Sequence, residues 1–600
     1  MRPVNPLRVR STRYASDQTV TRPTNPLRVR SNHHASADAV ADRIRWRVVT
    51  YRRRPRVAGD PSVDTALPVA ATRDVSRSLF NDSGTTLIGA QYVAESDTGS
   101  ERKRVDMTTG AIPPKLLHLA WPLVLGNLLQ TFYNLADMFW VGRIGDGGVS
   151  VAAVSLMFPL SWMFVSTAMG LTAATIALVS QYVGADDDRM ADKVVAQTIL
   201  LALAVSSVLA AAGLYFRRPL VWLIGARDQV YVESLAYIEV IFLALPLTFL
   251  FFAFRSSLQG AGDTKTAMWL VFVSAGINVV IDPFFILGWG PFPAMGTRGA
   301  AIATFIARGV AAAAGIYILL DGGFGIRLRL GDLAPDFSIL RQLIHVGYPS
   351  SIDGWARSFA AVAMAGFVAR FGAAPTAAYG IGVRLMSVTW AISGAVGNAT
   401  ATGVGQNLGA RTPDRAAAVT RTATAGTMIA IFAIAAVLVA FPAQAMRIFV
   451  ADPEVIAEGV VFLRIMAPFW ALFAGVMVIQ GAFRGAGNTR EAMVLSFLSR
   501  WIFRIPVALV LAFAWTVTVP GTGIAIAALE WGIEGIWWAY AFGMTVSFVV
   551  AVVWFRLGTW KEGVIDESES GDEPPRDGGP ADESSTHEHA PEGDAEFVDD

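Results

Sequence analysis

The sharpest chemical signal in the sequence is an acid within an apolar run, Asp137 in GNLLQTFYNLADMFWVG. The polar residues of this run are spaced three or four apart and so share one helical face; they are Asn127, Gln130, Asn134 and Asp137. An ionisable group in a membrane span is costly and indicates function. The alternative is a seam of hydrogen bonds to a partner helix. Pro122 lacks a backbone donor and predicts a bend in the same helix.

A second acid lies in a later apolar run, where Asn278 and Asp282 are four residues apart on one predicted face. In the following run, Thr304 comes four residues after Ala300. Two carboxylates, an amide oxygen and a hydroxyl are hard oxygen ligands that suit a small alkali cation. Two neighbouring carboxylates could instead share a proton. The residues therefore predict a site for Na⁺ or H⁺, and we expect no other cofactor.

Membrane-spanning helices must position these residues. The 600 residues are 54% hydrophobic and 16% charged, with a mean hydropathy of +0.47, which disfavours a soluble enzyme of this length. Because about 20 apolar residues cross the hydrocarbon, we predict an all-α polytopic membrane protein with twelve spans. They are 115–141, 149–183, 193–216, 232–258, 267–289, 298–320, 340–369, 376–407, 416–441, 455–482, 492–516 and 535–557.

The charges outside the spans predict orientation and two extensions. Lys and Arg are about twice as frequent in the even-to-odd loops and tail flanks as in the odd-to-even loops, which places both termini in the cytoplasm. The first 104 residues carry 19 Lys/Arg and 10 Asp/Glu, whereas residues 559–600 carry 2 and 15. We expect both extensions to be disordered, with no nucleic-acid partner. The predicted divisions are 1–110, 111–325, 326–560 and 561–600.

The second half of the membrane region repeats the first. LLHLAWP at 116–122 aligns with QLIHVGYP at 342–349, and GAGDTKTAM at 260–268 aligns with GAGNTREAM at 485–493. ATIALVSQYVGA at 174–185 also aligns with ATATGVGQNLGA at 399–410. The matches occur in order at offsets of 225 to 227 residues, so we predict two homologous six-helix bundles. Parallel repeats of this kind can rock about a central midplane site.

The two predicted acids have no counterparts in the second half. Asp137 aligns with Met364 and Asp282 with Val507, so ion coupling is expected in the first half alone. In the second half, Asp353 and Arg357 are four residues apart and are expected to pair with each other. An intramembrane enzyme would need a catalytic motif such as HExxH, and the spans contain none. We therefore expect a transporter and not an enzyme.

The chain resembles the multidrug and toxic compound extrusion (MATE) transporters. The motifs that carry the resemblance are WP(x3)G(x6)YN(x2)D(x3)VG at 121–142, the Q(x2)GA ends at 181–185 and 406–410, and QGAGDTKT at 259–266. It covers about 115–557 and is closest to the DinF-like branch, which includes archaeal members. The resemblance implies a cation site at Asp137, Asn278, Asp282, Ala300 and Thr304, with a bend at Pro122. It implies a substrate cavity lined by Gln130, Tyr133, Asn134 and Tyr237.

The resemblance further implies export of organic cations or amphipathic drugs from the cell, in exchange for Na⁺ or H⁺, by a monomer in the plasma membrane. The alternative transporter is a flippase for lipid-linked oligosaccharides, a relative of similar architecture. A flippase would be expected to have a strongly cationic central cavity for a pyrophosphate head group, whereas the first half is expected to be acidic. A membrane scaffold that does not transport would need neither Asp137 nor Asp282.

Overall fold

The computed structural model describes residues 104–145, 148–322, 325–518 and 525–565. The chain divides into two units, Met1–Ala94 and Glu95–Asp600, and every described residue belongs to the second. Most of the basic N-terminal segment and the acidic tail beyond residue 565 therefore lie outside the described residues, and so do the expectations made for them.

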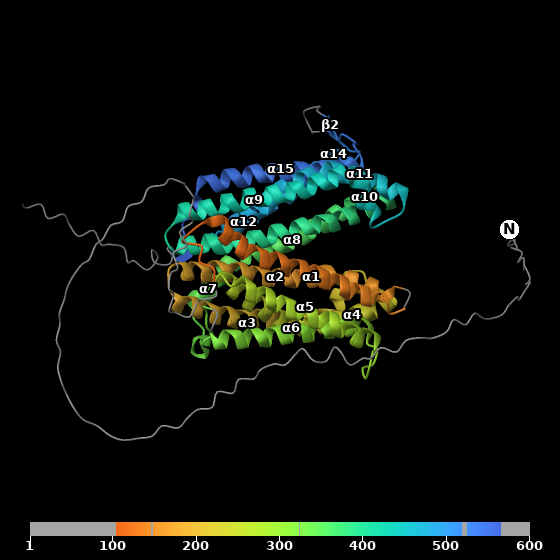
Figure 1. The fold of residues 1–600 in the computed structure, drawn as a ribbon. Coiled ribbons are helices and arrows are strands. Elements are labelled where there is room, and N and C mark those ends of the chain that lie inside the picture. The colour runs from red at the N-terminus through yellow and green to blue at the C-terminus, as the bar shows by residue number, and fades with distance from the viewer. Residues whose placement is uncertain (1–103, 146–147, 323–324, 519–524, 566–600) are drawn as a thin grey trace, which may run out of the picture. The chain divides into compact units, whose positions relative to one another are not determined.

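The first half consists of six long helices with short connections (Figure 1). They are α1 (Ile112–Val141), α2 (Val149–Gly184), α3 (Asp188–Leu223), α4 (Asp228–Gly260), α5 (Thr264–Leu287) and α6 (Gly296–Asp321). Aspartates begin two of them: Asp187 accepts a hydrogen bond from Met190 N–H, and Asp263 accepts one from Thr266 N–H. These caps satisfy backbone donors that have no partner within the helix.

The second half begins after the short 3-10 helix η1 (Leu330–Leu333) and is more interrupted. Its helices are α7 (Phe337–Ala369), α8 (Ala373–Gly409), α9 (Pro413–Ala440), α10 (Pro442–Arg447), α11 (Pro453–Met466), α12 (Trp470–Ala486), α13 (Thr489–Phe497), α14 (Ile505–Ala512) and α15 (Ile533–Leu557). The 3-10 turn η2 (Ala467–Phe469) joins α11 to α12, and the π-helical turn η3 (Leu498–Arg504) joins α13 to α14. Strands β1 (Thr516–Thr518) and β2 (Ala525–Ala527) form a small hairpin, and η4 (Thr559–Lys561) follows α15.

Twelve helical segments of the described chain are long enough to span a membrane, taking α11–η2–α12 and α13–η3–α14 as one each. Ten of them are also apolar enough by composition. The other two, α1 and α7, are the first helices of the two halves and carry more polar residues. The predicted twelve-helix membrane fold is confirmed, and each predicted span agrees with an observed segment to within about seven residues.

The contacts between the halves follow the internal repeat (Figure 1). Helix α1 packs against α8, and its counterpart α7 packs against α2, the counterpart of α8. Helices α2 and α8, themselves counterparts, also pack together. At one end of this seam, Gln181 Nε2 donates to the carbonyl of Gly485, and Thr402 Oγ1 donates to that of Gln259, each at 3.0 Å. The halves are therefore joined by equivalent surfaces.

Residues just before α1 are part of the fold, which corrects the expected boundary of the N-terminal extension at residue 110. Met107 is completely buried. Its N–H donates to Gln406 Oε1 at 2.9 Å, and its carbonyl accepts from Arg415 Nε at 2.9 Å. Val105 N–H donates to the carbonyl of Gly262 at 3.2 Å. The described segment 104–110 therefore bridges the two halves, because apolar burial and backbone hydrogen bonds outweigh the entropy of ordering it.

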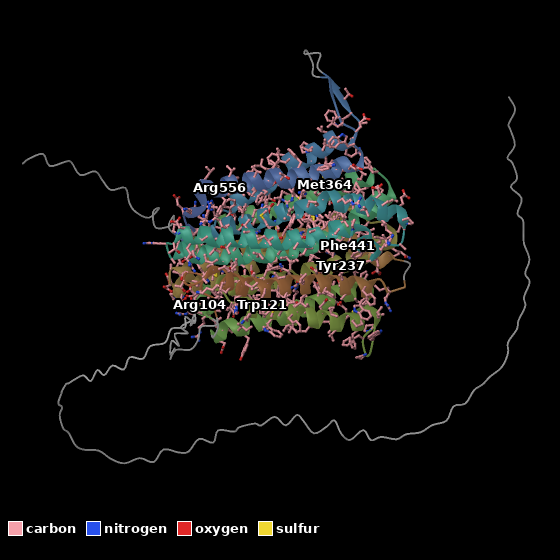
Figure 2. The ribbon with its side chains drawn as sticks, turned by 45° about the horizontal axis from the view of Figure 1, so that its top comes forward. Arg104, Trp121, Tyr237, Met364, Phe441 and Arg556 are labelled. Atoms are coloured by element: carbon pink, nitrogen blue, oxygen red, sulfur yellow. The ribbon has the colours of Figure 1, made fainter. Side chains whose placement is uncertain are left out.

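The other end of the described chain is anchored in the same region, so the expected start of the tail at residue 561 is also too early. Trp560 is fully buried. Lys561 Nζ lies 2.9 Å from Asp414 Oδ1, and Ile565 N–H donates to Gln181 Oε1 at 3.4 Å. Figure 2 shows Arg104 and Arg556 toward one end of the helices, with Tyr237 and Met364 further along. Both ends of the described chain thus lie at the same end of the helices.

Candidate functional site

Packing of α1 against α5, and of α5 against α6, brings together the acids and polar residues predicted as a cation site. Asp282 and Asn278 on α5 are 0% and 1% exposed. Asp137 lies one turn after Tyr133 on α1. Val141 of α1, Ile286 of α5 and Tyr237 of α4 pack in one cluster, which brings Asp137 and Asp282 into the same region. Residues from α1, α5, α6 and α4 therefore meet inside the first half.

Hydrogen bonds in this region converge on Thr304. Its Oγ1 lies 3.5 Å from Asn278 Nδ2 and 3.5 Å from the hydroxyl of Tyr133. The contact with Thr304 uses a donor of Asn278, whereas the acceptor Oδ1 of the same amide is buried without a hydrogen-bond partner. Both carboxylate oxygens of Asp282 and Oδ1 of Asp137 are also buried without one. Such oxygens are expensive to bury unless a cation or a proton satisfies them.

The chemical type of the oxygens without hydrogen-bond partners indicates which ions could bind. Carboxylate, amide and hydroxyl oxygens are the donors that hard cations prefer, and a shared proton would also satisfy a pair of acids. In the described part of the chain, no group of three or more His, Cys, Asp or Glu could hold a metal. The donor set therefore suits Na⁺ or H⁺, and the side chains are not those of a transition-metal centre.

A small pocket lies beside these residues on the side of Gln130 and Tyr133. It is too narrow to admit a water molecule and is lined by Gln130, Tyr133, Ser274, Ala275, Asn278, Thr304, Ala307 and Arg308. Two residues predicted to line the substrate cavity do not line this pocket. Asn134 is exposed and accepts from Gln130 Nε2 at 3.4 Å, while Tyr237 packs with the apolar residues around Ala300.

The remaining predicted residues have packing roles. Ala300 is completely buried in an apolar cluster with Val141, Val154 and Ile286, so its backbone carbonyl is the one oxygen it can offer. Pro122 is buried within α1, which continues on both sides of it. Because proline has no N–H, the backbone bond to residue 118 is missing there. This is the feature of α1 that favours bending.

Two arginines that lie inside the first half, the buried Arg308 and the half-buried Arg255, were not among the predicted site residues. Arg308 on α6 donates from Nη2 to Gln130 Oε1 at 3.2 Å and lies 4.2 Å from the ring centre of Phe251. Arg255 on α4 donates from Nη2 to Asn127 Oδ1 at 3.0 Å. The expectation of an acidic first half is wrong, because these cations balance the two acids in number. The rule applied to Asp137 would have found them, since each arginine interrupts an apolar run.

These bonds divide the polar face of α1 into two parts. Asn127 bonds to Arg255 and also donates from Nδ2 to the carbonyl of Ala391 at 3.1 Å. Gln130 bonds to Arg308. Asn127 and Gln130 therefore form hydrogen bonds to partner helices, as the alternative interpretation predicted for this face. Asp137 differs, because one of its oxygens is buried and has no hydrogen-bond partner among the described residues.

The corresponding region of the second half contains no acid at the equivalent positions. Met364, which aligns with Asp137, is 1% exposed in an apolar cluster. Arg357 Nη2 lies 2.6 Å from Asp353 Oδ2 within α7, which confirms the expected pair. Further arginines lie nearby on α12 and η3. The two halves therefore share a fold and differ in charge.

A duplicated bundle of twelve helices with a polar site inside one half defines a multi-pass membrane transporter. The MatE family model matches residues 122–284 and 349–510, one match in each half. The chain belongs to this family of MATE transporters, as the resemblance implied.

Relatives of known name agree with this assignment. The chain is 29% identical to the probable multidrug resistance protein YoeA of Bacillus subtilis, over 74% of this chain and 92% of that protein. It is 24% identical to the probable multidrug resistance protein NorM of Thermotoga maritima, over 76% of this chain and 94% of that protein. A solved multidrug resistance MATE transporter in an outward-facing conformation has a similar fold, with a TM-score of 0.67 and 24% identity. That match covers 77% of this chain and 98% of the other.

Proposed function

We propose that this protein is a secondary active transporter that exports amphipathic small molecules, organic cations included, in exchange for Na⁺ or H⁺. The observation that carries the proposal is the set of buried oxygens of Asp137, Asn278 and Asp282 that lack a hydrogen-bond partner. An ion arriving at this site removes a large electrostatic cost, and an ion leaving restores it. The imposed gradient of that ion would thereby drive the cycle.

Coupling requires that ion and substrate favour different conformations. A ligand shifts such an equilibrium only through its differential affinity for the two states. The site lies on α1, whose missing backbone bond at Pro122 makes bending cheap, and α1 packs against α8 of the other half. We infer that ion binding changes the bend of α1, so that the halves 111–325 and 326–560 rock and expose the site alternately. We place the protein in the plasma membrane, as a monomer with both termini in the cytoplasm.

Dye efflux from proteoliposomes under separately imposed Na⁺ and pH gradients tests this function. One of the two gradients should accelerate efflux, and the other should not. An efflux rate that changes with neither gradient would contradict ion coupling. Asp321 provides a matched control because it is an exposed acid at the end of α6, away from the site; Asp321→Asn should behave as the wild type.

The flippase alternative keeps one supporting observation, the excess of arginines in the second half. A pyrophosphate head group needs such cations. Translocation of a fluorescent lipid-linked oligosaccharide in the same liposomes, with no dye efflux, would favour the flippase over the drug exporter.

A further inference from the structure

The second half contains a pocket that the ion-coupling site does not use. It is a narrow cavity of about 10 Å³ between α12, η3 and α15, and its lining residues are Phe473, Val476, Met477, Gln480, Ser499, Arg500, Met544 and Ser547. The lining combines apolar, aromatic and sulfur-containing side chains with hydroxyl, amide and guanidinium groups. A pocket with such walls suits an amphipathic ligand.

Arginines crowd around this pocket. Arg484 follows Gln480 by one turn of α12, and Arg500 and Arg504 are four apart on η3. Gln480 and Arg500 line the same pocket, so Arg484 and Arg504 each lie one turn along the chain from a pocket residue. Trp501 Nε1 donates to the carbonyl of Ala356 at 3.3 Å, which holds η3 beside α7 and Arg357. The four guanidinium groups therefore form one electrostatic cluster, the basic cluster.

The basic cluster has too few anions. Asp353 pairs with Arg357 at 2.6 Å, and the other three arginines form no salt bridge with a described residue. Three guanidinium charges remain. Arg504 lies over the ring of Tyr540 at 4.2 Å, and Arg500 donates from Nη1 to the carbonyl of Ser496 at 3.1 Å. Neither contact supplies a negative charge.

Donor atoms in the basic cluster are also unused. Nε of Arg484 and Nε of Arg504 are buried and have no hydrogen-bond partner. Uncompensated cations inside a membrane protein are strongly destabilising. An oxyanion would satisfy both the charge and the planar guanidinium donors. The π-helical turn at 498–504, an element common at functional sites, places Ser499 and Arg500 on the pocket wall.

We propose that the basic cluster binds the phosphate or carboxylate group of an amphipathic molecule, and that the narrow pocket widens so that the apolar part of this molecule lies against Phe473, Met477 and Met544. This inference deepens the proposed function, because it makes acid-bearing amphipaths a substrate class of the exporter. The same chemistry occurs in a soluble amphipath and in the head group of an anionic lipid.

Binding to the purified full-length protein tests the proposal without any gradient. Octyl phosphate and octyltrimethylammonium have the same apolar chain and opposite head-group charge. In nanodiscs of phosphatidylcholine, octyl phosphate should raise the thermal unfolding midpoint in a saturable way, because a ligand of the native state stabilises it. Octyltrimethylammonium should not. Equal stabilisation by both compounds, or by neither in any lipid, would overturn the proposal.

Variants locate the effect. Arg484→Gln and Arg500→Gln should each lower the affinity for octyl phosphate at least about tenfold, as expected for the loss of a charged hydrogen bond. Arg500→Lys should retain part of the affinity. The matched control is Arg556→Gln, an exposed arginine at the far end of α15. If no anion binds here, Arg500→Gln should simply raise the midpoint by relieving repulsion, and octyl phosphate should act equally on wild type and variant; that result overturns the proposal even if Arg484→Gln fails to fold.

The lipid composition identifies the source of the anion. If a lipid head group occupies the basic cluster, nanodiscs of phosphatidylglycerol should stabilise the wild type and remove the effect of octyl phosphate. If a soluble amphipath is the ligand, octyl phosphate should act in both lipids. Either result supports the anion site. Asp137→Asn should keep this binding, so failure of the ion-coupling proposal would leave the test intact.

Discussion

Gly184 lies so close to the backbone carbonyl of Gln406 that a Cβ on the glycine would overlap it. The equivalent pair in the repeat, Gly409 and the carbonyl of Gln181, is equally close. These two contacts seal the ends of α2 and α8 against each other, next to Met107 and the segment that bridges the halves. The glycines of the two Q(x2)GA motifs are therefore required by a close helix approach.

Substituting either glycine should weaken this seal. Gly184→Ala and Gly409→Ala should each destabilise the conformation in which the ends of α2 and α8 touch, by about 1–3 kcal/mol, the usual cost of overpacking. A cysteine at the buried position Ser180 should then react faster with a maleimide, which is a clean probe because the native chain has no cysteine. Gly366→Ala is the control, since a Cβ there meets nothing within 4 Å. Unchanged labelling in both seal variants would contradict this role.

The segment before α1 offers a second prediction. Met107 is completely buried between the halves, so Met107→Ala should cost about 2–5 kcal/mol of stability. Deleting residues 1–103 and 566–600, which leaves the described contacts intact, should have little effect on thermal stability or transport. A large loss on deletion, at equal abundance in the membrane, would show that the extensions contribute to folding or regulation.

The connection between the halves should be sensitive to acid. Arg189 Nη2 lies 2.6 Å from Asp332 Oδ1, and this bond lowers the pKa of Asp332 below its usual value. Lys193 does the same for the pKa of Asp336. A lowered pKa in the folded state adds stability above the unfolded pKa of about 4, and this stability is lost as the pH falls through the folded value. Asp332→Asn should therefore reduce the unfolding midpoint slightly at pH 7, and the difference from wild type should vanish in acid.

Cysteine labelling also tests the orientation. A cysteine at Ser568 should react with a membrane-impermeant reagent only after the cells are opened, because both termini are proposed to be cytoplasmic. A cysteine at Asp228, the exposed first residue of α4, should react in sealed cells. The reverse labelling pattern would show that both termini lie outside the cell.

The sequence predicted the helices well because apolar length and polar breaks determine membrane spans directly. It also predicted that Asp353 pairs with Arg357, a local contact within one helix. The partners of Gln130 and Asn127 could not be predicted, because Arg308 and Arg255 reach them from other helices. The π-helical turn at 498–504 and the buried position of Met107 likewise depend on packing between distant segments. Neither leaves a periodic signal in the chain.

Ion coupling at Asp137 and Asp282 is tested most directly by separating substrate binding from its response to the gradient. Asp137→Asn and Asp282→Asn keep the size of each side chain and remove the charge. In proteoliposomes, both variants should still bind the dye but should lose the acceleration of efflux that the effective Na⁺ or pH gradient gives the wild type and Asp321→Asn. If both variants respond to that gradient as the wild type does, the coupling ion does not bind at these two acids.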